Sequence, residues 1–324
     1  MSALKTASIW TNKYFVAVMA IIACILWGSA FPVLKITYQE LQIGTGDVSA
    51  RMLIAGARFL LAGLILVFLQ KFVFRKSVAI PTRGFMPLLW LGLAQTGLQY
   101  FFFYNGVANS TGIKSAILNS VGNFLVVIFA HFIYPDDKLN TGKIFGLVTG
   151  FAGIILVNWQ AGAGGFSWDF SFIGEGFLIL AGLASVLGTF QAKKLTAKID
   201  PVTTNAYQLI FGSILLLGLG LPALADQSLR PTPLFWVLFV YSALLSAAAF
   251  SIWYNLLKYN KAGEVTIYRF VIPISGAILS GLLLPNESLT PSTVVALLLV
   301  ALGIGAINRW QNRAVQPTQS GEAG

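Results

Sequence analysis

Ten long apolar segments divide this chain and restrict it to folds that lie within a lipid bilayer. A bilayer-crossing helix needs about 20 predominantly apolar residues whose backbone groups are hydrogen-bonded within the segment. The windows that approach this length are 14–36, 48–70, 85–107, 113–134, 142–159, 173–191, 202–221, 234–257, 263–284 and 292–307. Short connections rich in turn-forming residues join them. We therefore predict an all-α integral membrane protein with ten transmembrane helices.

The composition supports the same class and excludes several others. The chain is 56% hydrophobic and only 10% charged, whereas soluble domains carry about 25% charged residues. The net charge of +10 does not indicate a nucleic-acid partner, because the basic residues are separated by apolar runs. Cys24 is the single cysteine, which excludes a disulfide framework and a multi-cysteine metal site. We expect no cofactor or metal, and the expected partners are the bilayer and a small-molecule substrate.

The positions of lysine and arginine predict the orientation of the helices. If the N-terminus is cytoplasmic, most of the 21 basic residues fall in cytoplasmic segments, as the positive-inside rule requires. An odd number of spans would remove this bias. We therefore predict a protein of the bacterial plasma membrane with both termini in the cytoplasm.

The two halves of the chain repeat each other at a spacing of about 150 residues. Tyr104-Asn105 recurs as Tyr254-Asn255, and Gly153-Ile154 recurs as Gly303-Ile304. Each half, 1–160 and 161–324, contains an odd number of predicted spans, so the copies must be inserted in opposite orientations. Inverted repeats of this kind are typical of solute transporters whose site lies between the repeats.

Several motifs carry a family resemblance. Residues 27–35 read Trp-Gly-Ser-Ala-Phe-Pro-Val-Leu-Lys, and 58–59 read Arg-Phe. Residues 260–262 read Asn-Lys-Ala, followed by Pro273 and by Glu-Ser-Leu-Thr at 287–290. In this order and spacing the chain resembles EamA-type members of the drug/metabolite transporter superfamily. The resemblance implies ten helices in two inverted five-helix repeats that move small organic metabolites, often outward.

The first half departs from this family pattern at two positions. Phe124 occupies the place of the proline, and Asp137 replaces the usual glutamate. These departures affect the match of the fourth predicted helix to the family pattern more than they affect the resemblance of the whole chain.

Two arginines, Arg58 and Arg269, fall within predicted spans. An ionisable side chain in hydrocarbon is costly and therefore indicates function. All eleven acidic residues fall in loops or near helix ends, so an anion or a zwitterion with a carboxylate suits the interior better than a cation. The alternative for both arginines is structural, for example hydrogen bonding to carbonyls at helix ends.

Uncharged polar side chains predict the rest of the lining. The amide pairs Gln95/Gln99 and Asn119/Asn123 each share one helix face, because their members stand four residues apart. Alternatively, these amides serve only to bond one helix to another. We also predict that three aromatic side chains form walls of the site: Trp27, Trp253 and Tyr268.

Prolines and titratable groups suggest how the protein works. Pro32 and Pro273 weaken the helical hydrogen bonding around them and are candidate hinges, or else static kinks. No Asp or Glu lies in the middle of a span, and the single histidine, His131, falls near a helix end. We therefore predict facilitated diffusion or exchange without a proton-carrying carboxylate in the middle of the membrane.

These features favour a transporter over an enzyme or a channel. One Cys, one His and no central carboxylate leave little material for catalysis, and no selectivity-filter pattern is present. We predict export of small metabolites such as amino acids by alternating access. The alternative is an organic-anion, sugar-phosphate or nucleotide-sugar carrier, favoured if Arg269 and Lys35 both face the cavity. Lys35 is otherwise assigned, with Arg58, a structural or gating role.

Overall fold

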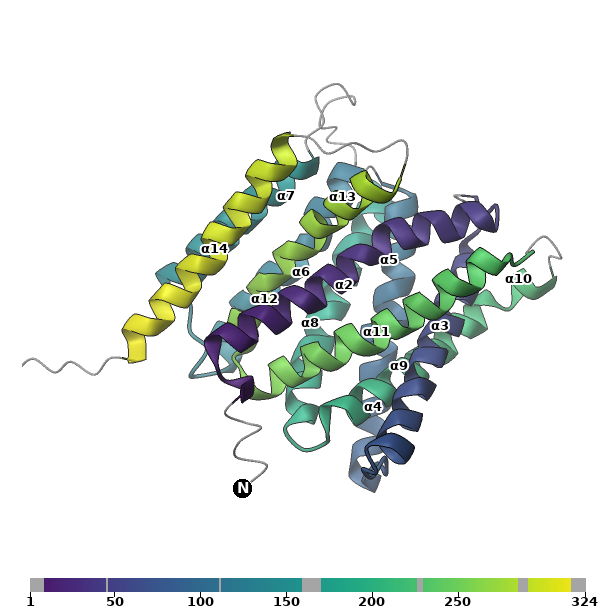
Figure 1. Ribbon diagram of the computed structural model, residues 1–324, viewed down its shortest axis with the longest axis horizontal. Helices are drawn as coiled ribbons and strands as arrows, with labels where there is room; N and C mark the ends of the chain where they lie inside the picture. Colours follow the sequence, from purple (N-terminus) through teal and green to yellow (C-terminus); the bar gives the residue numbers. More distant parts are fainter. Residues whose placement is uncertain are drawn as a thin grey trace, which may run out of the picture.

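The computed structural model describes residues 9–44, 46–110, 112–158, 170–225, 230–284 and 291–315. Within these ranges the chain forms helices and no strands, which confirms the predicted all-α class (Figure 1). The first half comprises α2 (Lys13–Glu40), α3 (Val48–Phe68), η1 (Leu69–Val73), η2 (Thr82–Gly84), α4 (Phe85–Gly92), η3 (Leu93–Leu98), α5 (Gln99–Ala108), α6 (Gly112–Ile133) and α7 (Thr141–Asn158). The second half comprises η4 (Phe172–Gly176), α8 (Phe177–Thr196), α9 (Pro201–Gly220), α10 (Pro222–Ala225), α11 (Pro233–Tyr259), α12 (Ala262–Thr266), η5 (Ile267–Phe270), α13 (Val271–Leu283) and α14 (Pro291–Val315).

Side-chain caps define where several helices begin. Asn12 Oδ1 accepts hydrogen bonds from the backbone N–H groups of Tyr14 and Phe15 at the start of α2. Asp200 and Thr232 cap α9 and α11, each directly before a proline at the first helical position. This arrangement satisfies donors that a helix start leaves open, and proline has no donor to lose there.

Six helical segments in the described ranges are long and apolar enough to cross a membrane: Lys13–Glu40, Val48–Val73, Phe172–Thr196, Pro201–Gly220, Pro233–Tyr259 and Ala262–Leu283. Shorter apolar stretches lie in α6, α7 and α14. The segment 85–108 is also continuously helical, but it carries two glutamines. The chain is thus an integral membrane protein.

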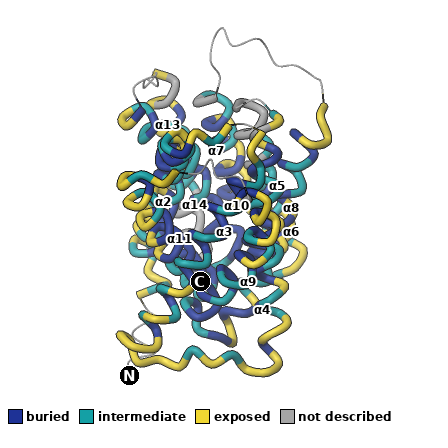
Figure 2. Tube along the Cα trace, turned by 90° about the vertical axis from the view of Figure 1, so that its right-hand side faces the viewer, coloured by how far each residue is buried: buried dark blue, intermediate teal, exposed yellow. Residues whose placement is uncertain are grey.

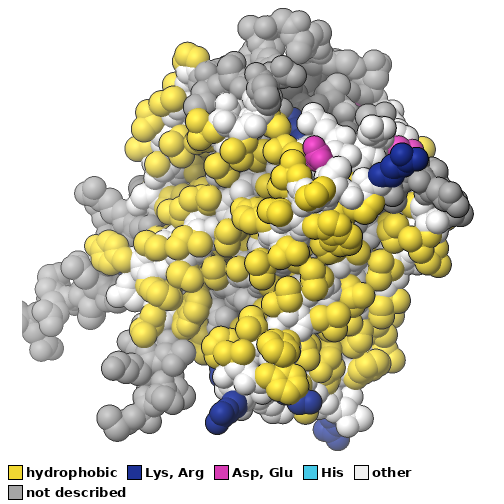
Figure 3. Space-filling model, turned by 45° about the vertical axis from the view of Figure 1, so that its right-hand side comes forward, with side chains coloured by type: hydrophobic (Ala, Val, Ile, Leu, Met, Phe, Trp, Pro, Cys, Tyr) yellow, Lys and Arg dark blue, Asp and Glu magenta, His cyan; other side chains and the backbone are white. Residues whose placement is uncertain are grey.

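The outer surface of the bundle suits lipid. Large hydrophobic side chains such as Leu64, Trp90 and Val237 are more than half exposed. The face in Figure 3 carries a broad belt of hydrophobic side chains, and charged side chains gather at its edges. Buried residues lie along the inner sides of the helices, as the tube in Figure 2 shows. This distribution is what a bilayer-embedded bundle requires.

Helices α7 and α14 lie side by side at one edge of the bundle and pack through small residues (Figure 1). A Cβ atom added at Gly303 would overlap with Thr149 Oγ1, and one at Gly153 would lie 3.1 Å from the carbonyl oxygen of Ala296. Close backbone approach of this kind is how small residues stabilise helix pairs in membranes. The remaining helices surround the centre of the molecule.

Candidate functional site

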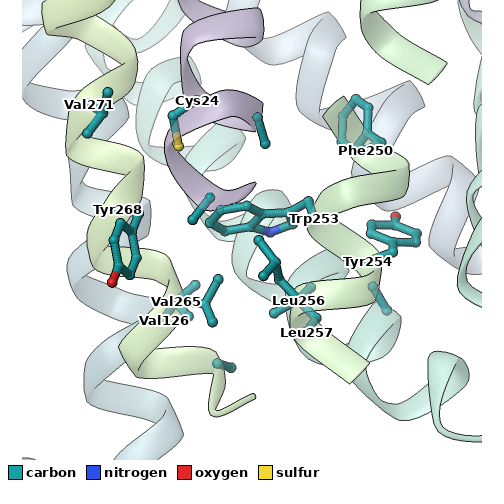
Figure 4. Close-up of a cluster of buried hydrophobic side chains, with 14 of the residues drawn as sticks. Cys24, Val126, Phe250, Trp253, Tyr254, Leu256, Leu257, Val265, Tyr268 and Val271 are labelled. Atoms are coloured by element: carbon teal, nitrogen blue, oxygen red, sulfur yellow. The ribbon is translucent and has the colours of Figure 1, made fainter. Parts of the chain in front are cut away.

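A small central cavity lies where α2, η3, α8, α11 and η5 meet. Its volume is about 10 Å³, room for about one water molecule. The lining residues are Trp27, Gln95, Thr189, Phe250, Trp253, Tyr254, Leu257 and Arg269. Figure 4 shows the Trp253 ring projecting from α11 into the space between α11 and the α12–α13 segment, with Tyr254 to its right.

Arg269 is held in this cavity by aromatic rings rather than by a carboxylate. Its guanidinium carbon lies 5.8 Å from the ring centroids of both Trp27 and Trp253. One terminal nitrogen donates a hydrogen bond to Ser185 Oγ (3.2 Å), and the buried Nε has no hydrogen-bond partner among the described residues. Among the described residues Arg269 makes no ion pair. A cation beside two indoles is favourable, but its charge remains available to an anion.

Unpartnered donors converge on the same cavity. Trp27 Nε1 and the Tyr254 hydroxyl are buried and, like Arg269 Nε, have no hydrogen-bond partner in the described part of the chain. Buried polar groups are normally satisfied, so each exception needs an explanation. Three such exceptions around one small cavity make it the candidate site for a polar ligand.

The local backbone explains how Arg269 reaches the cavity. Proline lacks an N–H, and its ring displaces the carbonyl four residues earlier, which for Pro273 is that of Arg269. The segment Ile267–Phe270 is accordingly a 3₁₀ turn between two α-helical stretches. Mid-helix 3₁₀ turns often mark functional hinges.

A second departure from α-helical geometry places Gln95. The segment Leu93–Leu98 is π-helical, and Gln95 Nε2 donates to Gln99 Oε1 at 2.7 Å. The next residue, Thr96, donates to Gln208 Oε1 (2.6 Å), and Gln208 Nε2 donates to Asn205 Oδ1 (3.0 Å). Such a connected buried network holds its members in one arrangement, and here it holds the π segment against α9.

The structure brings together four of the predicted lining residues: Arg269, Gln95, Trp27 and Trp253. The other predicted lining residues do not contribute to this cavity. Gln99 supports Gln95, and Tyr268 is buried with its hydroxyl pointing away from Trp253 (Figure 4). Asn123 is half-buried on α6 and is not part of the lining. The side chain of Asn119 lies outside the described residues.

The residues predicted as structural or gating lie elsewhere. Arg58 is 4% exposed on α3 and donates to the Tyr104 hydroxyl at 2.8 Å. Lys35 is exposed on α2 and is not part of the cavity lining. Pro32 is buried inside α2, which continues through it without a break in helical structure. Of the two prolines, Pro273 alone adjoins a change of helix type.

Sequence analysis missed the contribution of α8. Ser185 bonds Arg269, Thr189 lines the cavity, and Gly188 packs directly against the Gln95 amide. Their spacing of three and four residues places them on one helix face. This face of small and polar residues is the sequence feature from which the contribution of α8 could have been predicted.

Comparisons with known proteins agree with this architecture. The model of the EamA-like transporter family matches residues 14–159 and 172–309. The "Uncharacterized transporter YvbV" of Bacillus subtilis is 27% identical over 88% of this chain and 88% of its own length. The "S-adenosylmethionine/S-adenosylhomocysteine transporter" of Chlamydia muridarum is 23% identical, covering 86% of each chain. A solved structure titled "Crystal structure of protein" superposes with a TM-score of 0.75 at 17% identity, over 93% of this chain and 99% of that one.

Proposed function

We propose that this chain, which belongs to the EamA-like transporter family, exports small metabolites that carry a carboxylate, such as amino acids. The observation that carries this proposal is the half-buried Arg269, whose guanidinium lies beside two indoles and makes no ion pair with the described residues. A carboxylate entering the cavity would supply the missing partner of Nε through a charge-assisted hydrogen bond. The Gln95 amide and the Tyr254 hydroxyl offer further polar contacts beside it.

Two observations help to choose among substrate classes. One relative is named for transport of S-adenosylmethionine and S-adenosylhomocysteine, which are amino-acid derivatives with a carboxylate. The alternative of an organic-anion, sugar-phosphate or nucleotide-sugar carrier is favoured if Lys35 and Arg269 both face the cavity, but Lys35 is exposed and does not line it. A single arginine suits one carboxylate better than a phosphate group of higher charge.

The proposal includes ten spans in two inverted five-helix repeats. The contacts between helices support this proposal. The main contacts made by a helix of one half have equivalents made by the corresponding helix of the other half. Helix α3 packs on its counterpart α9, and α7 packs on α14. The contacts of α2 with α13 and α11 are matched by those of α8 with α6 and α5. An even number of spans places both termini on one side, and the lysine and arginine distribution supports the proposal that this side is the cytoplasm. The proposed host membrane is the bacterial plasma membrane.

The size of the cavity and the contacts at one end of it support the proposal of alternating access. A space for about one water molecule admits no metabolite until helices move apart. At the proposed cytoplasmic side, Asp137 accepts a hydrogen bond from the N–H of Gly263 (2.8 Å) and pairs with Lys143. Lys193 donates to the carbonyls of Leu257 and Asn260. These contacts close the inner end, and Pro273 is the proposed hinge.

Transport reconstituted in liposomes tests this function. Purified protein is expected to move L-methionine and other amino acids, to move succinate and glucose 6-phosphate more slowly, and not to move cations that lack a carboxylate. A pH-sensitive dye inside the vesicles should show no proton movement coupled to the solute. Transport of cations alone, or proton flux that follows the solute, would contradict the proposal.

Gly188→Ala tests the position of the Gln95 amide. An added Cβ would overlap with Gln95 Oε1, so the amide must shift into the cavity. Overpacking of this kind costs about 1–3 kcal/mol, and we expect methionine transport to fall by about 10-fold. The matched control is Gly218→Ala on α9, where a Cβ would meet nothing within 4 Å. Equal rates for both variants would contradict the assigned position of Gln95.

A further inference from the structure

A buried arginine, Arg58, lies outside the cavity within a cluster of tyrosines. Arg58 donates to the Tyr104 hydroxyl at 2.8 Å, and its guanidinium carbon lies 4.5 Å from the centroid of the Phe59 ring. Tyr38 of α2 lies near both Tyr104 and Arg58. The Tyr100 ring lies 4.7 Å from that of Phe59 and 5.8 Å from that of Tyr104. We call Arg58, Tyr38, Tyr100 and Tyr104 the tyrosine–arginine cluster.

Arg58 is bound incompletely by the protein. Its side chain is 4% exposed, yet its buried Nε has no hydrogen-bond partner, and it makes no ion pair with any described residue. A buried charge without a counter-ion costs several kcal/mol. A purely structural arginine would be expected to use all its donors. The free donor and the unneutralised charge instead suit an anion that arrives and leaves.

The cluster continues from the cavity toward one face of the molecule. Tyr100 lies near both Arg58 and Arg269, and Tyr254 of the cavity lies near Tyr100. On the far side, the guanidinium carbon of Arg51 lies 5.8 Å from the Tyr38 ring, and Arg51 bonds the carbonyl of Gly44 between α2 and α3. Arginines and tyrosine hydroxyls therefore lead from the central cavity to the α2–α3 connection.

We propose that Arg58 and Tyr104 form a second anion-binding station, which the carboxylate of the solute occupies on its way between Arg269 and the face that carries the α2–α3 connection. This inference rests on the proposed function. The planar guanidinium with a hydroxyl beside it can hold a carboxylate through two hydrogen bonds. For rapid passage, binding must be strong enough for the solute to enter, and a further site must be present so that the solute can leave the first one. A second cation draws the carboxylate away from Arg269.

The kinetic consequence separates the two arginines. Arg269 determines the affinity of the cavity, whereas Arg58 determines the rate at which solute leaves it. In proteoliposomes we expect Arg58→Gln to lower the maximal transport rate of L-methionine about 10-fold, with the dissociation constant of the cavity changed less than about 2-fold. Arg58→Lys should recover part of the rate because the charge remains. Tyr104→Phe, which keeps the ring, should slow transport about 3-fold.

The experiment measures binding to purified protein and transport for each variant, with L-methionine, succinate and glucose 6-phosphate as probes. The thermal unfolding temperature of each variant reports a structural role. Normal rates in folded Arg58→Gln and Tyr104→Phe proteins would overturn the station, as would a loss of affinity without a loss of rate. If Arg58→Gln does not fold, the transport rates of Tyr104→Phe and Arg58→Lys test the station. Wild-type rates in both of these variants would then overturn it. If the wild-type protein carries none of these probes, the proposed function itself fails.

Discussion

Replacing Arg269 with glutamine is expected to lower transport of carboxylate-bearing solutes by about 100-fold. Glutamine keeps much of the length of the side chain and some hydrogen bonding but removes the charge beside Trp27 and Trp253. Truncating one member of a buried charge pair costs about 2–5 kcal/mol, and about 1.4 kcal/mol corresponds to tenfold. The measurement is initial uptake of L-methionine into proteoliposomes, together with its dissociation constant, which should rise in parallel.

Two controls make this result specific. Arg230→Gln removes one positive charge from an exposed position and should leave transport unchanged. Arg269→Lys keeps the charge but loses the planar group that lies against the indoles, so its rate should lie between those of wild type and Arg269→Gln. An Arg269→Gln protein that transports L-methionine normally would show that Arg269 does not bind the carboxylate.

Asp137→Asn is expected to destabilise the protein by about 3–5 kcal/mol, because it leaves the charge of Lys143 buried without its counter-ion. Asp137 and Lys143 are each 1% exposed, and Asp137 also joins the α6–α7 connection to the start of α12. We expect a clear drop in the thermal unfolding temperature of the purified protein. The drop should be accompanied by easier opening of the inner end, measured as faster reaction of cysteines placed there.

The neighbouring residue supplies the control. Asp136 is exposed, so Asp136→Asn should change the unfolding temperature little. The double variant Asp137→Asn/Lys143→Gln removes both buried charges and should regain part of the lost stability. If Asp137→Asn and Asp136→Asn have the same unfolding temperature, the pair does not stabilise the closed inner end.

Sequence reasoning reached the helices and the central cation because both follow from polarity alone. Apolar run length predicts spans, and an arginine at position 269 stands out within an apolar run. The aromatic neighbours Trp27 and Trp253 were also found, since few large side chains with a polar edge lie near the motifs. These features depend on composition and spacing within one helix.

Contacts between helices were harder to predict from the sequence. Tyr268 precedes Arg269, but the 3₁₀ turn before Pro273 sets which of the two side chains faces the cavity. The π segment around Gln95 likewise changes the register of the helix. As a result Gln95 lines the cavity, whereas Gln99 only accepts a hydrogen bond from the Gln95 amide. The role of Gly188 depends on the close approach of α8 to Gln95, a distance between segments far apart in sequence.

The most direct test of a central cavity reached alternately from two faces uses a cysteine at Thr189. This residue lines the cavity and is 3% exposed, and the native Cys24 is buried and can be replaced by serine to give a cysteine-free background. We expect Thr189→Cys to react with a membrane-impermeant anionic thiol reagent added to either side, and L-methionine to slow both reactions. Reaction from one side only, or rates that L-methionine does not change while transport continues, would contradict a substrate site at Arg269.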